Sequence, residues 1–420
     1  MLPRHILYSI FVFCKGDMEM SANTRGAGVF LELRKRLQSG LLIIGKDVAA
    51  NPTGIVVTGQ DSSLHIRTTT GEVTFLLPPG VSYVKESYVL VSGRESCEEE
   101  LHFRLRITAS HIKTEESSDI VRALRAQETY CFYCQSCMTR LLEDRLFTRV
   151  LPLPNGNWNT IVDDWCCHPD PFANKKMLPR AADCLLGDTF FLLTRDDSCK
   201  QTLLQEVSTT DSQDSKDPKK TCRRLELVSC MSCSSVLGEA LTPETLRLYV
   251  TQVVVEPSVG DRMPESSVSR SFFLESTIAA RLAALSNSMS SFHFSVQTPS
   301  GKPFLLLWLL NSDSIMASVP GWSDCTVTHH SPSVRAAKAI KLLYIDCSHM
   351  GVQQQAVATS WEVNATGHAV VFPLKVCEEL LQVIEDSSAT LPYSMRHMKA
   401  YKLLLRKLKL SLCFSICKKI

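Results

Sequence analysis

The stretch FYCQSC at residues 132–137 contains a CxxC pair, and a second pair, CMSC, follows at residues 230–233. Two thiolates separated by two residues can grip one tetrahedral metal ion while backbone amides of the turn point at the sulfurs. Two such pairs supply the four sulfur ligands of a closed structural zinc site. The sequence therefore predicts one structural Zn²⁺ ion in a zinc-ribbon or tent-like β unit, bound by Cys134, Cys137, Cys230 and Cys233.

Each pair leads into a similar sequence, MTRLLE after Cys137 and SSVLGE after Cys233, as if two like hairpins meet at the metal. A long insert separates the pairs, but the entropy cost of loop closure rises only with the logarithm of loop length. Structural zinc binding contributes about 10 to 16 kcal/mol in small peptides, which is enough to offset that cost. Separate redox dithiols and ordinary buried cysteines are the alternatives.

Length and composition describe a globular protein of two or three packed units. The chain has 420 residues, of which 45% are hydrophobic and 21% charged, with a net charge of +2. This balance favours neither nucleic acid nor anionic lipid as a direct partner, and no apolar run reaches the roughly 20 residues of a membrane span. The odd number of cysteines, 17, fits a reducing compartment, so we expect a cytoplasmic protein, with the nucleus as a second location.

The pattern along the chain predicts an α+β fold, with a β-rich N-terminal half and a mixed α/β C-terminal half. Short alternating strands separated by turn residues indicate a β-sandwich-like domain, and helical periodicity appears at residues 273–289, 334–345, 375–384 and 395–408. Five segments follow: an unstructured extension (1–24), the β-sandwich-like domain (25–130), a zinc-knuckle β domain with a long inserted loop (131–250), a mixed α+β region (251–400) and a basic terminal segment (401–420).

The inserted loop concentrates unusual side chains in the string WCCHPDPF. Its prolines favour an extended conformation, which lowers the entropy lost on docking, and an exposed thiolate there could cap a partner's metal ion. Packing of tryptophan and cysteine in a core is the alternative, and a second metal site that also uses Cys184 is disfavoured because adjacent ligands strain a tetrahedral chelate. The loop residues are Trp165, Cys166, Cys167, His168, Pro169, Asp170, Pro171 and Phe172.

Five strings in the same order resemble a known family: FYCQSC, RVLPLPxxNW, WCCHPDPFANK, the second CxxC followed by LGE, and LLWLLNSDS. Together they are similar to the HECT-like ubiquitin-protein ligases that bind a cyclin-selective ubiquitin-conjugating enzyme. The resemblance runs from about residue 29 to about residue 398 and implies a HECT-like region within residues 251–400. It implies transfer of ubiquitin from a conjugating enzyme to lysines of substrates such as cyclins, for proteasomal degradation.

The same resemblance suggests where partners bind. It places the conjugating-enzyme-binding stretch near residues 253–282, whose apolar helical residues fit a core equally well. The WCCHPDPF loop is also similar to an inhibitory motif that inserts into metallo-β-lactamase-fold endonucleases of pre-mRNA 3′-end processing. That similarity implies that Cys167 caps the partner's zinc, and a non-catalytic inhibitor is therefore the alternative function.

HECT-type transfer needs an accessible cysteine that accepts ubiquitin as a thioester. Cys377 is the first candidate, because VFPLKVCEELL at residues 371–381 and the later LPY are similar to the pattern around a HECT nucleophile; Cys347 is the second. A helix that begins near Leu374 would lower the pKa of Cys377, whereas Glu378 and Glu379 would raise it. The helical spacing of Cys377 is also that of a buried stripe.

Overall fold

The computed structural model describes residues 7–13, 27–60, 62–91, 100–110, 119–153, 178–208, 225–258, 269–320, 333–348 and 367–396. The chain divides into two compact units. Unit 1 comprises Met1–Lys113, Pro303–Ala365 and Leu381–Ile420, and unit 2 comprises Thr114–Lys302 and Thr366–Leu380. Neither unit is one continuous segment, which differs from the five consecutive segments that the sequence suggested.

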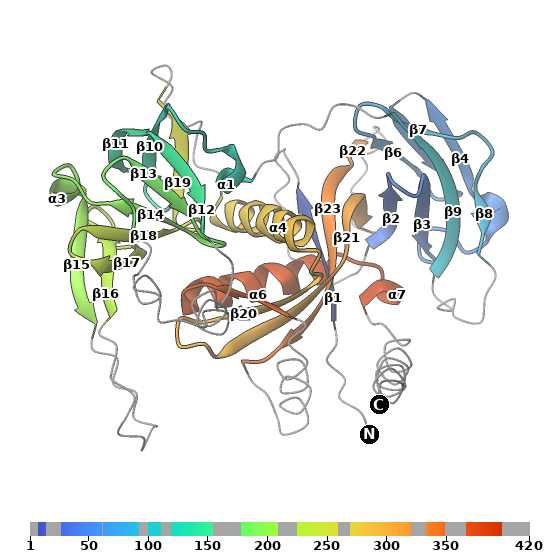
Figure 1. Ribbon diagram of the computed structural model, residues 1–420. Helices are drawn as coiled ribbons and strands as arrows, with labels where there is room; N and C mark the ends of the chain where they lie inside the picture. Colours follow the sequence, from blue (N-terminus) through green and yellow to red (C-terminus); the bar gives the residue numbers. More distant parts are fainter. Residues whose placement is uncertain are drawn as a thin grey trace, which may run out of the picture. The chain divides into compact units, whose positions relative to one another are not determined.

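Unit 1 contains two sheets (Figure 1). The larger has the strand order β1 (Leu7–Phe13), β23 (Ala337–Asp346), β21 (Pro303–Pro320), β2 (Ala27–Arg34), β3 (Ser39–Gly45), β9 (Glu100–Ala109) and β7 (Val81–Tyr83), with β8 (Val89–Leu90) also paired to β9. The smaller has the order β22 (Ser333–Arg335), β6 (Glu72–Leu76), β5 (Ser63–Arg67) and β4 (Val56–Gln60), and a short 3₁₀ helix covers Pro52–Gly54.

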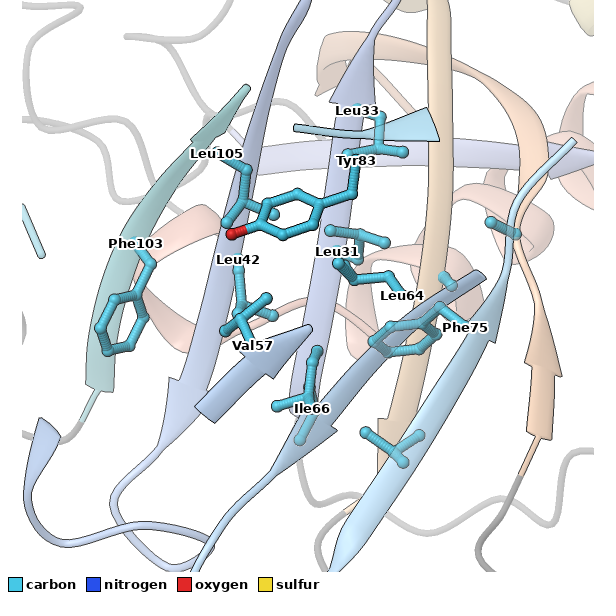
Figure 2. Close-up of a cluster of buried hydrophobic side chains, with 14 of the residues drawn as sticks. Leu31, Leu33, Leu42, Val57, Leu64, Ile66, Phe75, Tyr83, Phe103 and Leu105 are labelled. Atoms are coloured by element: carbon cyan, nitrogen blue, oxygen red, sulfur yellow. The ribbon is translucent and has the colours of Figure 1, made fainter. Parts of the chain in front are cut away.

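The strand pattern of residues 27–109 forms β2 to β9 in unit 1, and strands from the second half of the chain pair with them, whereas residues from Thr114 onward belong to unit 2. Side chains alternate along β5, where Leu64 and Ile66 are buried and their neighbours are more exposed, as expected of a sheet with one wet face. Apolar residues of both sheets form one core cluster. Figure 2 shows part of this cluster, with Leu31, Leu33, Leu42, Val57, Leu64, Ile66 and Phe75 among the labelled residues.

Two expectations for unit 1 were wrong. Residues 334–345 were expected to be helical, but they form β22 and most of β23, which pairs antiparallel with β21. Nearly every side chain of β23 is buried on both faces, so its continuous apolar run lacks the alternation that marks a half-exposed strand. Residues 1–24 were expected to be unstructured, but Leu7–Phe13 forms β1 along the edge of β23.

Unit 2 also contains two sheets. The smaller has the order β11 (Arg140–Phe147), β10 (Glu128–Cys134) and β19 (Val253–Pro257). The larger has the order β12 (Arg149–Pro152), β13 (Asp183–Leu186), β14 (Phe190–Thr194), β18 (Thr245–Tyr249), β17 (Val236–Thr242), β16 (Leu225–Cys230) and β15 (Leu203–Ser208). Their side chains share one core, in which the rings of Phe132 and Phe191 pack edge to face with their centroids 5.9 Å apart.

Helices occupy few of the described residues. The two long ones are α4 (Arg270–Met289) and α6 (Leu374–Ala389), which begin near the predicted positions. The C-terminal half therefore has helices, but strands dominate there too, including the parallel pair β20 (His293–Gln297) and β24 (His368–Val371). The short helices are α1 (Ile120–Ala123), α3 (Cys199–Thr202) and α7 (Tyr393–Arg396). Among the described helices, none has the length and apolar character of a membrane span.

Candidate metal centre and candidate nucleophiles

The two CxxC pairs form matching hairpin turns in unit 2. In the first, between β10 and β11, the backbone N–H of Cys134 donates to the carbonyl of Thr139 at 2.8 Å, and that of Met138 donates to Cys134 at 2.8 Å. In the second, between β16 and β17, the backbone N–H of Cys230 donates to the carbonyl of Ser235 at 2.9 Å, and the backbone N–H of Ser234 donates to the carbonyl of Cys230 at 2.8 Å. The backbone hydrogen bonds of the two turns therefore correspond one to one.

The residue at the corresponding position of each turn has a left-handed backbone conformation. Met138 has a φ of 58° and Ser234 a φ of 57°, values that non-glycine residues adopt at some energetic cost. Each lies directly after the second cysteine of its pair, where the chain must reverse tightly. The like geometry explains why similar sequences follow the two pairs.

The four sulfurs converge on one point. Cys134 Sγ lies 3.6 Å from Cys233 Sγ, and Cys137 Sγ lies 3.7 Å from Cys230 Sγ. All four sulfurs lie within 4.8 Å of one another. A tetrahedron of sulfurs about 2.3 Å from a Zn²⁺ ion has edges of about 3.8 Å, so the four residues fit this ion. They fill all four positions of a tetrahedral site, which is the arrangement of a structural rather than a catalytic metal.

The environment of the thiols explains why a cation would be needed. Cys134 and Cys230 are buried, and burial raises the pKa of both thiols. Cys137 and Cys233 reach the surface. Several thiolates in so small a volume repel one another and are costly to desolvate without a compensating positive charge. The cluster can therefore hold a divalent cation, and the structure brings all four predicted ligands together.

Both candidate nucleophiles are buried. Cys377 is 0% exposed, and its Sγ donates to the carbonyl oxygen of Phe372 at 3.6 Å. Burial, with a further contribution from Glu378, raises the pKa of Cys377 to about 12. Cys347 is 2% exposed, and its Sγ donates to the carbonyl oxygen of Ile345 at 3.8 Å. The neutral thiol of Cys377 is not poised for attack while α6 is packed in this way.

Comparison with known proteins identifies the family. The model of the HECT-like ubiquitin-conjugating enzyme (E2)-binding family matches residues 32–403. The chain belongs to this family. It is similar to proteins named as E3 ubiquitin-protein ligases, with 38% identity over 408 residues to that of Mus musculus and 34% over 408 residues to that of Homo sapiens.

The alignments span nearly the whole of both proteins. The mouse alignment covers 92% of this chain and 99% of the relative, and the human alignment covers 93% and 100%. The rat protein of the same name, from Rattus norvegicus, is 36% identical over 404 residues, which cover 91% of this chain and 97% of the relative. A comparison with solved structures found no match.

The stretch expected to bind the conjugating enzyme, residues 253–282, contains β19 and most of α4. The apolar residues Ile278 and Leu282 of α4 are buried, which is the arrangement of a core helix. Phe272 and Phe273 near its start are half-buried. The apolar stripe of α4 is therefore covered, and a contact between this stretch and a conjugating enzyme stays a prediction.

The WCCHPDPF loop at residues 165–172, including Cys167, lies outside the described residues. Its role as a partner-binding loop stays a prediction. Cys184, considered as a further ligand to a second metal, is 0% exposed on β13, and burial raises the pKa of its thiol to about 12.

The sequence did not reveal the charged residues that position α4. Arg281 is buried and donates from Nη1 to Asp119 Oδ2 at 2.8 Å, and Arg270 donates from Nη2 to Glu379 Oε2 at 2.7 Å. The position of Arg270 could have indicated an ion pair, because a cation at the start of a helix opposes the helix dipole and needs a compensating partner. The partners are distant in sequence and could not be identified from spacing.

Proposed function

We propose that this member of the family is an E3 ubiquitin-protein ligase, which binds a charged ubiquitin-conjugating enzyme and promotes transfer of ubiquitin to substrate lysines. The match of the HECT-like E2-binding model to residues 32–403 carries this proposal. Relatives named as E3 ubiquitin-protein ligases, which align over nearly their full length, support it. Cyclins are the substrate class that the family resemblance implies, with proteasomal degradation as the outcome, and we propose the cytoplasm and nucleus as locations.

We further propose that Zn²⁺ is the ion held by Cys134, Cys137, Cys230 and Cys233. The sulfur–sulfur distances support this choice, since soft thiolates in a tetrahedral set suit zinc. The ion would hold the hairpins of β10–β11 and β16–β17 together and would leave no open position for a substrate.

In a covalent mechanism, the Cys377 thiolate attacks the carbonyl carbon of the thioester between conjugating enzyme and ubiquitin. The conjugating-enzyme thiolate leaves, and ubiquitin becomes a thioester of Cys377. A substrate lysine amine then attacks that carbonyl, releases the Cys377 thiolate and gives up a proton as the isopeptide bond forms. Because Cys377 is 0% exposed, this route requires the first turns of α6, which carry the sulfur, to move away from the residues that cover it.

The test uses the full chain with a conjugating enzyme charged with labelled ubiquitin. Ligase activity predicts faster discharge onto lysine or substrate than with the conjugating enzyme alone, and equal rates would refute the proposal. The covalent route further predicts an adduct that a reducing agent removes and that Cys377→Ala abolishes. An adduct that survives Cys377→Ala but is lost in Cys347→Ala would assign the thioester to Cys347.

The burial of both candidate thiols favours one second function, a non-catalytic binding protein. In that case Cys167 would cap the zinc of a metallo-β-lactamase-fold pre-mRNA 3′-end endonuclease. Cys167→Ala should then weaken association with the endonuclease and relieve its inhibition, while thermal unfolding stays the same. Equal affinities of the wild type and the variant would remove this alternative.

A further inference from the structure

Arg270, the first residue of α4, hydrogen-bonds to three other segments of unit 2. Its Nε and Nη2 donate to Glu379 Oε2 on α6, at 3.0 and 2.7 Å. Its Nη1 donates to Gln135 Oε1 in the first metal-binding turn at 3.0 Å, and also to the backbone oxygen of Thr251. One guanidinium therefore connects α6, the metal-binding turn and the turn between β18 and β19.

The setting makes these hydrogen bonds stronger than those of a surface ion pair. The side chains of Arg270 and Glu379 are only 28% and 27% exposed, so water screens their charges less than on an open surface. Two guanidinium nitrogens approach the same carboxylate, and charge-assisted bonds of this kind are the strong ones. They also offset the cost of placing a cation at the positive end of the α4 dipole.

Gln135 gives Arg270 a fixed anchor. It lies between the cysteines of the first pair and is 6% exposed. Its backbone N–H donates to the carbonyl oxygen of Gln252 at 3.1 Å. The anchor is therefore part of the same turn that presents Cys134 and Cys137, and this turn is hydrogen-bonded to the turn between β18 and β19.

Glu379, which accepts from Arg270, lies near the buried thiol of Cys377. Glu379 is two residues after Cys377 in the first turns of α6, and Cys377 is 0% exposed. The backbone N–H of Cys377 donates to the carbonyl oxygen of Pro373 at 3.1 Å, as part of the same turn. Whatever holds these turns in place also keeps reagents away from the sulfur, because a buried thiol reacts only when the surrounding structure opens.

We infer that Arg270 is a positioning residue, which fastens the first turns of α6 to the metal-binding turn and so keeps Cys377 covered. Displacement of Arg270 from Glu379 uncovers the thiol. A role of this displacement in ubiquitin transfer rests on the proposed function, in which Cys377 accepts ubiquitin. The effect of Arg270 on the exposure of Cys377 does not depend on that function, and it can be measured without a conjugating enzyme.

The experiment compares alkylation of Cys377 in the full chain, quantified by peptide mass spectrometry, in Glu379→Ala and in Glu378→Ala. The two glutamates are adjacent, and Glu378 is exposed and is the carboxylate that raises the pKa of Cys377. Removing either one changes local charge, but only Glu379→Ala breaks the bond to Arg270. We expect alkylation to be about tenfold faster in Glu379→Ala, and within about twofold of the wild-type rate in Glu378→Ala.

Two further measurements distinguish local exposure of Cys377 from a general destabilisation of unit 2. Cys184, which is 0% exposed on β13 of the same unit, should keep its wild-type alkylation rate. Gln135→Ala removes one of the two bonds that hold Arg270 at the other end, leaves the bond to Thr251 and does not alter α6, so it should also speed alkylation of Cys377, by less than Glu379→Ala does. Equal rates in Glu379→Ala and Glu378→Ala, or a parallel rise at Cys184, would overturn the inference. Faster alkylation without any ubiquitin adduct would support the fastening and reject Cys377 as the acceptor.

Discussion

Each exposed thiol of the metal centre has a hydroxyl group beside it. Thr139 Oγ1 lies 3.2 Å from Cys137 Sγ, and Ser235 Oγ lies 3.3 Å from Cys233 Sγ. A hydroxyl that donates to a metal-bound thiolate holds the sulfur in place and stabilises its charge, and loss of such partners typically weakens metal binding by about 10- to 100-fold. The two hydroxyls occupy the same position in the two turns, so they should act alike.

We therefore expect Thr139→Val and Ser235→Ala to release zinc to a chromogenic chelator about tenfold faster than the wild type. Ser136→Ala is the control, because it removes an exposed hydroxyl from the first turn and leaves both sulfur contacts intact. Identical release rates in all three variants would show that these hydroxyls have no part in holding the metal.

Glu32 in unit 1 is a buried carboxylate between two cations. It is 0% exposed and accepts from Lys341 Nζ at 2.9 Å and from Arg34 Nε at 3.1 Å. Burial pushes the pKa of Glu32 upward, but Lys341 and Arg34 outweigh it and hold that pKa below its usual range. Burial also lowers the pKa of Lys341 in spite of Glu32, so the pair is less favourable than the shift of Glu32 alone suggests.

A carboxyl group with a lower pKa in the folded state contributes stability above its unfolded pKa, about 4.3 for Glu, and this stability is lost as pH falls through the folded pKa. Lys341→Met should raise the pKa of Glu32 and move acid unfolding to higher pH, and should cost about 3 kcal/mol at neutral pH. Glu32→Leu combined with Lys341→Met should cost much less. Circular dichroism against pH and urea measures both, and a single variant as stable as the double variant would contradict the account.

Gly238 shows why an element can depend on one small residue. It follows the second metal-binding turn on β17 and lies opposite Leu248 of β18. A Cβ atom at this position would collide with the backbone oxygen of Arg247. Backbone cannot yield as a flexible side chain would, so the approach of β17 to β18 requires glycine. This requirement explains the glycine of the LGE string that follows the second CxxC pair.

Gly238→Ala should therefore destabilise unit 2 by about 3 kcal/mol, the upper range for overpacking a closed site. Urea unfolding, followed by hydrogen exchange in β17 and β18, measures the effect, while β2 and β3 of unit 1 serve as an internal reference. A variant with the wild-type unfolding midpoint in unit 2 would show that the strands can separate at little cost.

The sequence predicted those elements whose pattern is local. Alternation identified strands such as β5, and periodicity located the start of α6 at Leu374. It misassigned β23, because a strand buried on both faces has no alternation. It placed Cys377 on the right helix, but exposure depends on residues that pack against the helix from elsewhere, and a single sequence does not show them.

At the scale of the whole molecule, the metal centre belongs to unit 2 alone. The four cysteines come from the β10–β11 and β16–β17 hairpins, and all lie within Thr114–Lys302. Removal of the ion by a chelator should therefore raise hydrogen exchange in these hairpins and leave β2, β3 and β9 of unit 1 protected. Exchange that increases equally in both units would show that the centre supports the entire chain.

The division into units could be predicted only in part. CxxC spacing predicted that residues far apart in sequence meet, and the sulfur distances bear this out. No comparable motif marks the pairing of β2 with β21, which joins the sandwich to residues from Pro303 onward. Strand pairing over such separations depends on complementary faces rather than on a local signal, so the sequence suggested consecutive segments where the structure divides into two discontinuous units.

Native mass spectrometry of the intact chain shows directly whether Cys134, Cys137, Cys230 and Cys233 bind one zinc ion. We expect one zinc ion per folded chain, which is lost on acid denaturation and absent when Cys134 and Cys230 are both replaced by serine. A folded chain without metal, or zinc retained by the double variant, would contradict it.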